Sequence, residues 1–229
     1  MAIPVYDGKL QVQTVSCLLN EQSLAARNGH EIVVAFLPGC SVPALGRNTL
    51  VQRFLDSDCD RLVFLDADIT FEVGALLKIA HLPVDFVGGC YRFKTENEQY
   101  PIGWATEGGE EIWANSLGLI EVATLPTGFL SLSRKVFETL AAAHPDRNYS
   151  HFGEKAFCFF QMVFKDGFLW SEDTYFCREW REAGGKVYLD PDLTLTHWDA
   201  KTTYVGNIGE WLKTNWPAPE GKKHAESLS

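Results

Sequence analysis

Residues 61–71, RLVFLDADITF, constrain the fold more than any other part of this sequence. Four consecutive apolar residues, 62–65, are bounded by polar ones, which is typical of a strand buried on both faces of a parallel sheet. The strand ends at Asp66-Ala67-Asp68, just before an expected helix. In open α/β sheets, ligands bind at the carboxyl ends of the strands. The segment therefore predicts a ligand site at this edge of a parallel sheet.

Asp66 and Asp68 are two residues apart, so on an extended backbone their side chains point to the same side. Like charges this close repel each other, and a cation relieves the repulsion. Mg²⁺ is usually held by one or two carboxylates together with substrate phosphates. A solvated loop is the alternative, because a D-x-D sequence alone is weak evidence for a metal site. The apolar strand that leads directly into it favours a metal site.

Composition limits the class of protein. The chain has 229 residues, of which 46% are hydrophobic, enough for one large α/β domain or two small ones. A net charge of −10 argues against a nucleic-acid partner. The six cysteines form no C-x-x-C pair, which favours reduced thiols over a disulfide framework or zinc site. Because no segment reads as membrane-spanning and no leader is evident, we expect a cytoplasmic protein, with peripheral membrane attachment left open.

The first part of the chain alternates between expected strands and helices. The strands are expected near residues 1–5, 31–37, 62–65 and 85–90, and the helices near residues 9–28, 41–58 and 71–80. This order with short connections predicts a doubly wound, mostly parallel central sheet flanked by helices.

The second part is less regular. Residues 91–119 show little periodicity and predict hairpins or a long loop. A strand is expected near 119–125, helices near 133–143 and 171–183, and a late strand within 186–197. Residues 144–167 are irregular and aromatic; core packing is the default for these aromatics, and an acceptor surface is the alternative.

Further candidate residues lie outside the D-x-D segment. Glu172 and Asp173 open a helix, where acidic residues complement the helix dipole or, alternatively, one serves as a general base. His197 ends the late strand and is either structural or a metal ligand. Arg47 and Lys94 are candidates for contact with a diphosphate, with surface solvation as the alternative. The sequence has no G-x-G-x-x-G and no P-loop, which counts against nicotinamide dehydrogenases and P-loop NTPases.

Four motifs, taken in order, resemble the glycosyltransferases of the GT-A fold. They are PGCS leading to GRN (38–48), FLDAD (64–68), LPTGFLSLSRKVFE (125–138) and SEDTYFCREWREAGGKVYLDPDLTLTH (171–197). The likeness runs from residue 2 to about residue 206. Enzymes of this family bind a nucleotide-diphosphate sugar through a divalent metal and transfer the sugar to an acceptor.

The resemblance implies roles for individual residues. Asp66 and Asp68 would lie at the metal, the ribose and the diphosphate, with Ala67 between them and Asp68 as the more direct ligand. His197 matches a late-strand histidine that adds a metal ligand. Glu172 and Asp173 match an acidic pair next to the acceptor, and Asp173 is our choice for the base.

The resemblance also implies contacts to the donor. Gly128 matches a tight backbone turn beside the donor sugar, and Tyr6, at the end of the first strand, would stack on the nucleobase. We expect one Rossmann-like GT-A domain over residues 1–216, with a nucleotide-binding half (1–95), a smaller acceptor-side half of strands and loops (96–216), and a disordered tail (217–229).

The function expected from these residues is transfer of a hexose from a UDP- or GDP-sugar, dependent on Mn²⁺ or Mg²⁺. A sugar-phosphate nucleotidyltransferase, a non-catalytic nucleotide-sugar-binding protein and a purely structural α/β domain are the alternatives. The acceptor (a saccharide, a lipid-linked molecule or a small molecule), the stereochemical outcome and the oligomeric state stay open.

Overall fold

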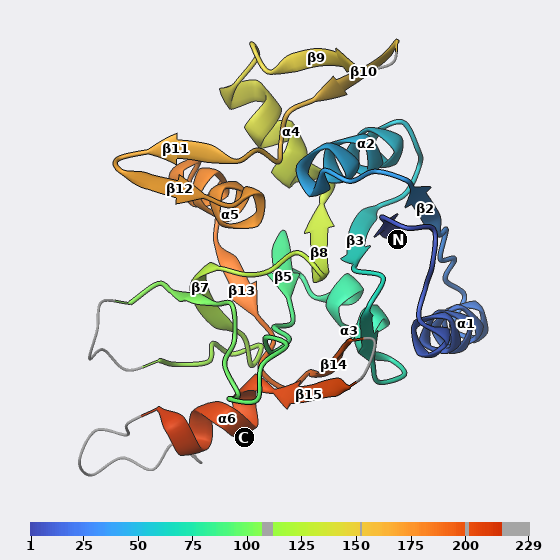
Figure 1. Cartoon of the computed structure of the whole chain (residues 1–229), viewed down its shortest axis with the longest axis vertical. Coiled ribbons are helices and arrows are strands. Elements are labelled where there is room, and N and C mark those ends of the chain that lie inside the picture. The colour runs from blue at the N-terminus through green and yellow to red at the C-terminus, as the bar shows by residue number, and fades with distance from the viewer. Residues whose placement is uncertain (107–111, 152, 200–201, 217–229) are drawn as a thin grey trace.

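The computed structural model describes residues 1–106, 112–151, 153–199 and 202–216 (Figure 1). Its centre is an eight-stranded mixed sheet with the order β2-β1-β3-β8-β5-β13-β7-β6. The strands of this sheet are β1 (Ala2–Val5), β2 (Ala35–Pro38), β3 (Arg61–Leu65), β5 (Phe86–Gly88), β6 (Gly103–Trp104), β7 (Ile120–Thr124), β8 (Phe129–Ser133) and β13 (Val187–Leu189). The expected tail, residues 217–229, lies outside the described residues.

Six helices are formed within the described ranges: α1 (Val12–Arg27), α2 (Pro43–Leu55), α3 (Ala75–His81), α4 (Arg134–Ala143), α5 (Glu172–Glu182) and α6 (Ile208–Asn215). None of these is long and apolar enough to cross a membrane. The remaining strands form a three-stranded sheet and two hairpins: β4 (Ile69–Phe71) with β14 (Thr194–Trp198) and β15 (Thr203–Asn207), β9 (Asn148–His151) with β10 (Glu154–Phe157), and β11 (Val163–Lys165) with β12 (Phe168–Trp170).

Strand β3 is buried on both faces, as its apolar run predicts. Phe64 packs into a core with α2, α4 and α5, whereas Val63 and Leu65 pack into a second core with α1 and α3. Successive side chains of a strand point to opposite faces, so one strand supplies both cores. The result is a mixed α/β fold of three layers, in which β3 lies inside the sheet between β1 and β8.

The prediction of a mostly parallel sheet is wrong. β1 pairs in parallel with β2 and β3, and β5 with β13, but the other four pairings of the sheet are antiparallel. The main cause is β8, which comes from the second half of the chain, inserts between β3 and β5 and runs against both. The alternation of strands and helices in the first half accounts for the parallel part of the sheet but does not reveal this insertion.

The segment after Asp68 also differs from expectation. A helix was expected from about residue 71, but β4 comes first and α3 begins only at Ala75. β4 pairs antiparallel with β14, and this pairing places His197 opposite Ile69. β14 thereby brings His197, from the second half of the chain, next to the D-x-D segment.

Candidate functional site

A cavity of about 660 Å³ lies where β1 and β3 end. The predicted residues Tyr6, Arg47, Asp66, Ala67 and Asp68 all line it, together with the segment that leads into α1 and the loop before α2. Tyr6 is 69% exposed, which leaves its ring free at the cavity wall. A cavity of this size is within the range of small-molecule sites. Predicted residues from three separate segments of the chain thus meet at one opening.

Asp66 is held from three sides. Arg47 Nη2 lies 3.1 Å from its Oδ1, the Tyr91 hydroxyl donates to its Oδ2 over 3.3 Å, and its backbone N–H donates to the Gly128 carbonyl over 3.0 Å. A Cβ atom added to Gly128 would lie 2.6 Å from both Asp66 Oδ2 and the Tyr91 ring. Gly128 therefore permits the close approach of backbone and carboxylate at this point.

Arg47 is buried and joins the two acidic segments of the site. Its side chain is 7% exposed, and its Nε lies 3.8 Å from Glu172 Oε1. Burial alone would lower the pKa of the guanidinium, but the charges of Asp66 and Glu172 outweigh it and raise the pKa. Burial acts in the opposite direction on the Glu172 carboxyl and raises its pKa. Nε and Nη1 of Arg47 have no hydrogen-bond partner among the described residues, so this buried cation has donors to spare.

Asp68 and His197 meet across the β4–β14 pairing. His197 Nε2 lies 3.4 Å from Asp68 Oδ2, and Lys94 Nζ lies 2.5 Å from the same oxygen. Partial burial alone would raise the pKa of Asp68, but hydrogen bonds with His197 and Lys94 lower it to about 2. Asp68 is therefore a carboxylate already surrounded by positive or hydrogen-bonding groups.

Asp68 and His197 present a carboxylate oxygen and an imidazole nitrogen side by side, two atom types that bind divalent cations in proteins. His197 Nδ1 donates to the Arg92 carbonyl oxygen over 3.0 Å, which turns Nε2 toward Asp68, and a cation would replace the proton that Nε2 shares with that carboxylate. Metal-binding histidines are usually oriented by such a bond. Within the described residues no three His, Cys, Asp or Glu side chains cluster as a complete metal site. Asp66, the third expected ligand, is paired with Arg47 and Tyr91 instead, so of the three predicted ligands the structure brings only Asp68 and His197 together.

Asp173 lies in the first turn of α5 and is partly buried. Its Oδ1 accepts hydrogen bonds from the Thr174 backbone N–H over 2.7 Å and from the Ser171 hydroxyl. Burial, Asp66 and, to a smaller extent, Asp173 raise the pKa of Tyr91 well above its usual value. Asp173 is thus close enough to act on Tyr91 electrostatically, although neither acid of the 172–173 pair lines the cavity.

Two residues of the site were not anticipated. Tyr91 touches Asp66 and packs edge-on against His197, with ring centroids 4.9 Å apart. Thr14, on α1, is fully buried, and its hydroxyl lies 3.2 Å from the carbonyl oxygens of both Ala67 and Ile69. Thr14 thereby fixes the backbone that carries the D-x-D carboxylates. No motif marks either residue, and only the packing of α1 and of the segment after β5 reveals them.

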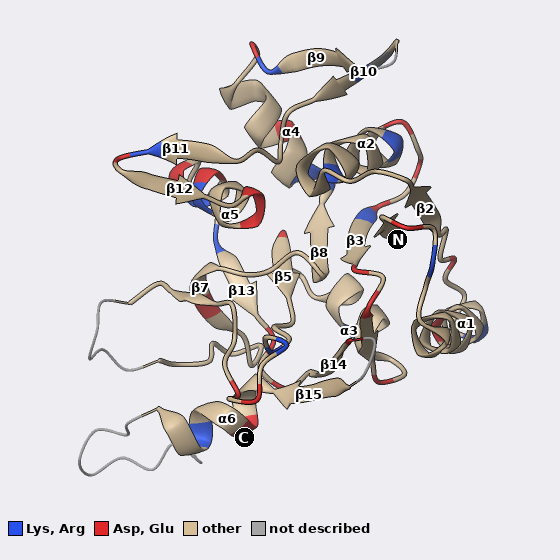
Figure 2. Ribbon diagram, viewed as in Figure 1, with Lys and Arg blue, Asp and Glu red and all other residues tan. Residues whose placement is uncertain are grey.

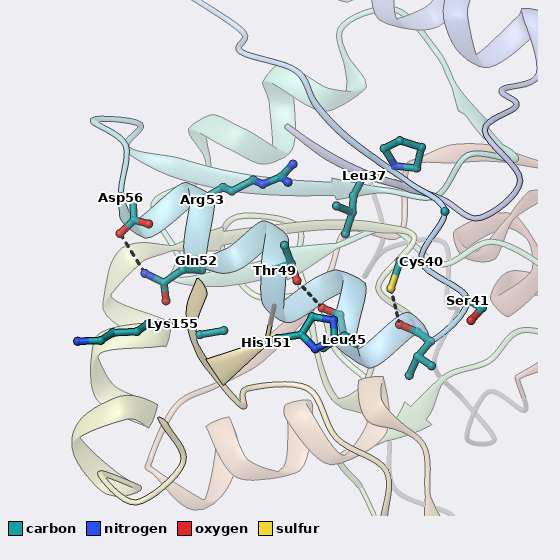
Figure 3. A pocket seen from close by; sticks show the side chains of 14 residues that line it. Leu37, Cys40, Ser41, Leu45, Thr49, Gln52, Arg53, Asp56, His151 and Lys155 are labelled. Carbon is teal, nitrogen blue, oxygen red and sulfur yellow. Dashed lines mark hydrogen bonds between the residues drawn. The ribbon is translucent and has the colours of Figure 1, made fainter. Parts of the chain in front are cut away.

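A second cavity, of about 940 Å³, lies between α2 and the β9–β10 hairpin (Figure 3). It shares Cys40 and Ser41 with the first cavity, so the loop before α2 separates the two. Gln52 and Asp56 hydrogen-bond to each other at its edge over 3.0 Å. None of the predicted site residues lines this cavity.

Comparison with known proteins gives a fold but no family. No protein-family model and no curated protein sequence matches the chain. The crystal structure of A197 from STIV is similar, with a TM-score of 0.55 and 19% identity over 90% of this chain and 92% of that one. The catalytic domain of Drosophila β1,4-galactosyltransferase 7, in complex with xylobiose, gives a TM-score of 0.46 and 14% identity over 100% of this chain and 78% of that one. At this identity the likeness to A197 shows a shared mixed α/β fold.

Proposed function

We propose that this chain is a glycosyltransferase of the GT-A type, which transfers a hexose from a UDP- or GDP-sugar to a hydroxyl acceptor. The observation that carries the proposal is the meeting of Asp68 with His197 beside a cavity lined by Tyr6, Arg47 and Asp66. These residues come from four separate segments of the chain, and their joint arrangement would be unexplained in a purely structural domain.

The donor would occupy the 660 Å³ cavity. Tyr6 would stack on the base, and Ala67, as a small residue, would let the ribose and diphosphate approach the backbone. Arg47 lines the cavity, and among the described residues its Nη1 has no hydrogen-bond partner and Lys94 is bound only to Asp68. Both cations would offset the charge of the diphosphate.

Asp68 and His197 would hold a divalent cation, either Mn²⁺ or Mg²⁺, with diphosphate oxygens completing its ligands. When bound, such an ion neutralises charge that builds up on a departing diphosphate. Lys94 now shares Asp68 Oδ2 and would move toward the diphosphate as the cation binds. Tyr91 and Gly128 would fix Asp66 against the donor.

Asp173 would act as the base that takes the proton from the acceptor hydroxyl. Its hydrogen bonds with described residues all reach Oδ1, which leaves Oδ2 for the acceptor. Arg47 keeps Glu172 close to the donor side of the site, so the first turn of α5 is held next to the cavity. The hydroxyl and the donor sugar would thus be positioned together, which is a large part of catalysis for such a transfer.

The test is a thermal-shift screen with UDP- and GDP-sugars, with and without Mn²⁺, followed by an assay for hydrolysis of any donor that binds. The proposal predicts a metal-dependent rise in melting temperature through linkage and slow release of the nucleotide diphosphate. Stabilisation by a nucleoside triphosphate with a sugar 1-phosphate, and release of pyrophosphate, would identify a nucleotidyltransferase instead. No response to any nucleotide would contradict the proposal.

A further inference from the structure

The segment between β1 and α1 forms one wall of the 660 Å³ cavity, which Tyr6, Asp7 and Lys9 all line. This segment follows β1, whereas the D-x-D segment follows β3, the neighbouring strand of the sheet. Neighbouring strands lie about 4.8 Å apart, so the two segments stand side by side at the same edge. A nucleotide whose diphosphate lies at Asp68 can therefore place its base on the wall formed by residues 6–9, where the exposed Tyr6 ring offers a stacking surface.

This wall carries one acidic and one basic residue, Asp7 and Lys9, on the segment between β1 and α1 (Figure 2). The Lys9 backbone N–H donates to Asp7 Oδ1 over 3.1 Å, and Lys9 Nζ lies 3.4 Å from Asp7 Oδ2. The backbone hydrogen bond from Lys9 lowers the pKa of Asp7, so at neutral pH its two oxygens only accept hydrogen bonds. The wall thus presents an oriented pair of acceptors with a cationic donor beside it.

The Asp7–Lys9 pair is accessible to a ligand. The two side chains are 53% and 83% exposed, and among the described residues Lys9 Nζ has no partner other than Asp7. Exposed ion pairs contribute little to folding stability. Substitutions at either residue should therefore leave the fold intact and report on ligand binding alone.

The edge of guanine matches this pair of side chains. Guanine presents two adjacent N–H donors, at N1 and the 2-amino group, followed by the acceptor O6. A carboxylate can accept both donors, one at each oxygen, while a neighbouring ammonium donates to O6. Uracil presents a single N–H between two carbonyl groups, one of which would face a carboxylate oxygen. Guanine therefore forms hydrogen bonds with both Asp7 oxygens and with Lys9, whereas uracil leaves one Asp7 oxygen opposed by a carbonyl.

We propose that Asp7 and Lys9 select guanine and that the donor is accordingly a GDP-sugar; this rests on the proposed function. Asp7 accepts from N1–H and the 2-amino group, Lys9 donates to O6, and Tyr6 stacks on the ring. A base that lacks one of these donors leaves a carboxylate oxygen unpaired beneath it, and such an unpaired polar group is a strong source of discrimination between ligands.

The test is calorimetric titration of the full chain, in the presence of Mn²⁺, with GDP, UDP and inosine diphosphate (IDP). IDP differs from GDP only by the absence of the 2-amino group. We expect GDP to bind about tenfold or more tightly than either of the others. Asp7→Asn replaces one acceptor oxygen by an amide donor, so GDP should lose its advantage and the affinities for GDP and IDP should become about equal, with an unchanged melting temperature of the free protein.

The matched control is Asp56→Asn, which changes an exposed carboxylate that lines the second cavity and should preserve the preference for GDP over IDP. UDP or IDP bound as tightly as GDP by the wild type, or a GDP preference that survives Asp7→Asn, would overturn the inference. Tight binding of UDP alone would overturn it while leaving the proposed function in place. Binding of none of the three nucleotides would contradict the proposed function and this inference together, so the two failures are distinguishable.

Discussion

His197 Nε2 lies 3.4 Å from Asp68 Oδ2, although the two residues come from opposite halves of the chain. The contact depends on the antiparallel pairing of β4 with β14, in which His197 faces Ile69, the residue after Asp68. The Trp198 backbone N–H also donates to the Asp68 carbonyl over 2.8 Å. The late strand is therefore fixed to the D-x-D segment through its backbone, independently of any ligand.

Replacing Arg47 tests the charged bridge between Asp66 and Glu172. Arg47→Met leaves both carboxylates beside a buried site without their counterion, and removal of one partner of a buried pair typically costs about 3–5 kcal/mol. Urea denaturation should show a loss of this order. Arg53→Met, on the exposed side of the same helix, should change the free energy of unfolding by less than about 0.5 kcal/mol. Equal effects of the two substitutions would argue against the bridge.

Gly128 is expected to tolerate no side chain. In Gly128→Ala the Cβ atom meets Asp66 Oδ2 and the Tyr91 ring at 2.6 Å, so the carboxylate or the backbone must move. We expect a loss of about 1–3 kcal/mol in stability and weaker binding of any nucleotide that the wild type binds. Gly46→Ala is the control, because its Cβ meets Cys40 and Leu37 at ordinary contact distances of 3.4–3.6 Å and the helix gains alanine. Unaltered binding in Gly128→Ala would remove Gly128 from the donor site.

Thr14 is expected to position the D-x-D backbone. Thr14→Val keeps the shape of the side chain but removes the hydroxyl that lies near the Ala67 and Ile69 carbonyls. The free energy of unfolding should fall by about 1 kcal/mol. Nucleotide affinity should fall as well, because the backbone that carries Asp66 and Asp68 is no longer fixed. Thr49→Val removes a hydroxyl that bonds only within α2, to Leu45, and should leave nucleotide affinity intact. Equal affinities in the two variants would make Thr14 merely structural.

Asp173→Asn tests the base. The amide keeps a hydrogen-bond acceptor for Thr174 but cannot take a proton, so donor binding should persist while transfer falls by at least about 100-fold. The measurement is the rate of nucleotide-diphosphate release with and without acceptor, beside calorimetric affinity for the donor. Turnover at the wild-type rate would exclude Asp173 from the role.

The sequence predicts features that depend on neighbouring residues better than features that depend on residues far apart in the chain. The unbroken run 62–65 identifies β3, and the acidic opening of α5 is read from Glu172 and Asp173 alone. β8 was missed because Ser131 and Ser133 interrupt its apolar pattern, although Ser131 is fully buried and hydrogen-bonds to Arg61. The antiparallel insertion of β8 is a non-local pairing that no periodicity encodes.

In helix α1 the sequence predicts the helix but not the face that it buries. Its apolar residues Val12, Val15 and Leu19 are 75%, 38% and 61% exposed, whereas polar Thr14 and Glu21 are fully buried. Glu21 accepts hydrogen bonds from the Gly74 and Leu77 backbone N–H groups at the start of α3. Helical spacing therefore predicts that α1 forms, but the face it buries is decided by hydrogen-bond partners elsewhere in the chain.

The central claim is that Asp68 and His197 hold a divalent cation together with a nucleotide diphosphate. The most direct test is an anomalous difference map from crystals soaked with Mn²⁺ and UDP or GDP. The account predicts a manganese peak within bonding distance of Asp68 Oδ2 and His197 Nε2, with Lys94 moved toward the diphosphate. A nucleotide bound in the cavity with no manganese at Asp68, and Lys94 still paired with that carboxylate, would contradict it.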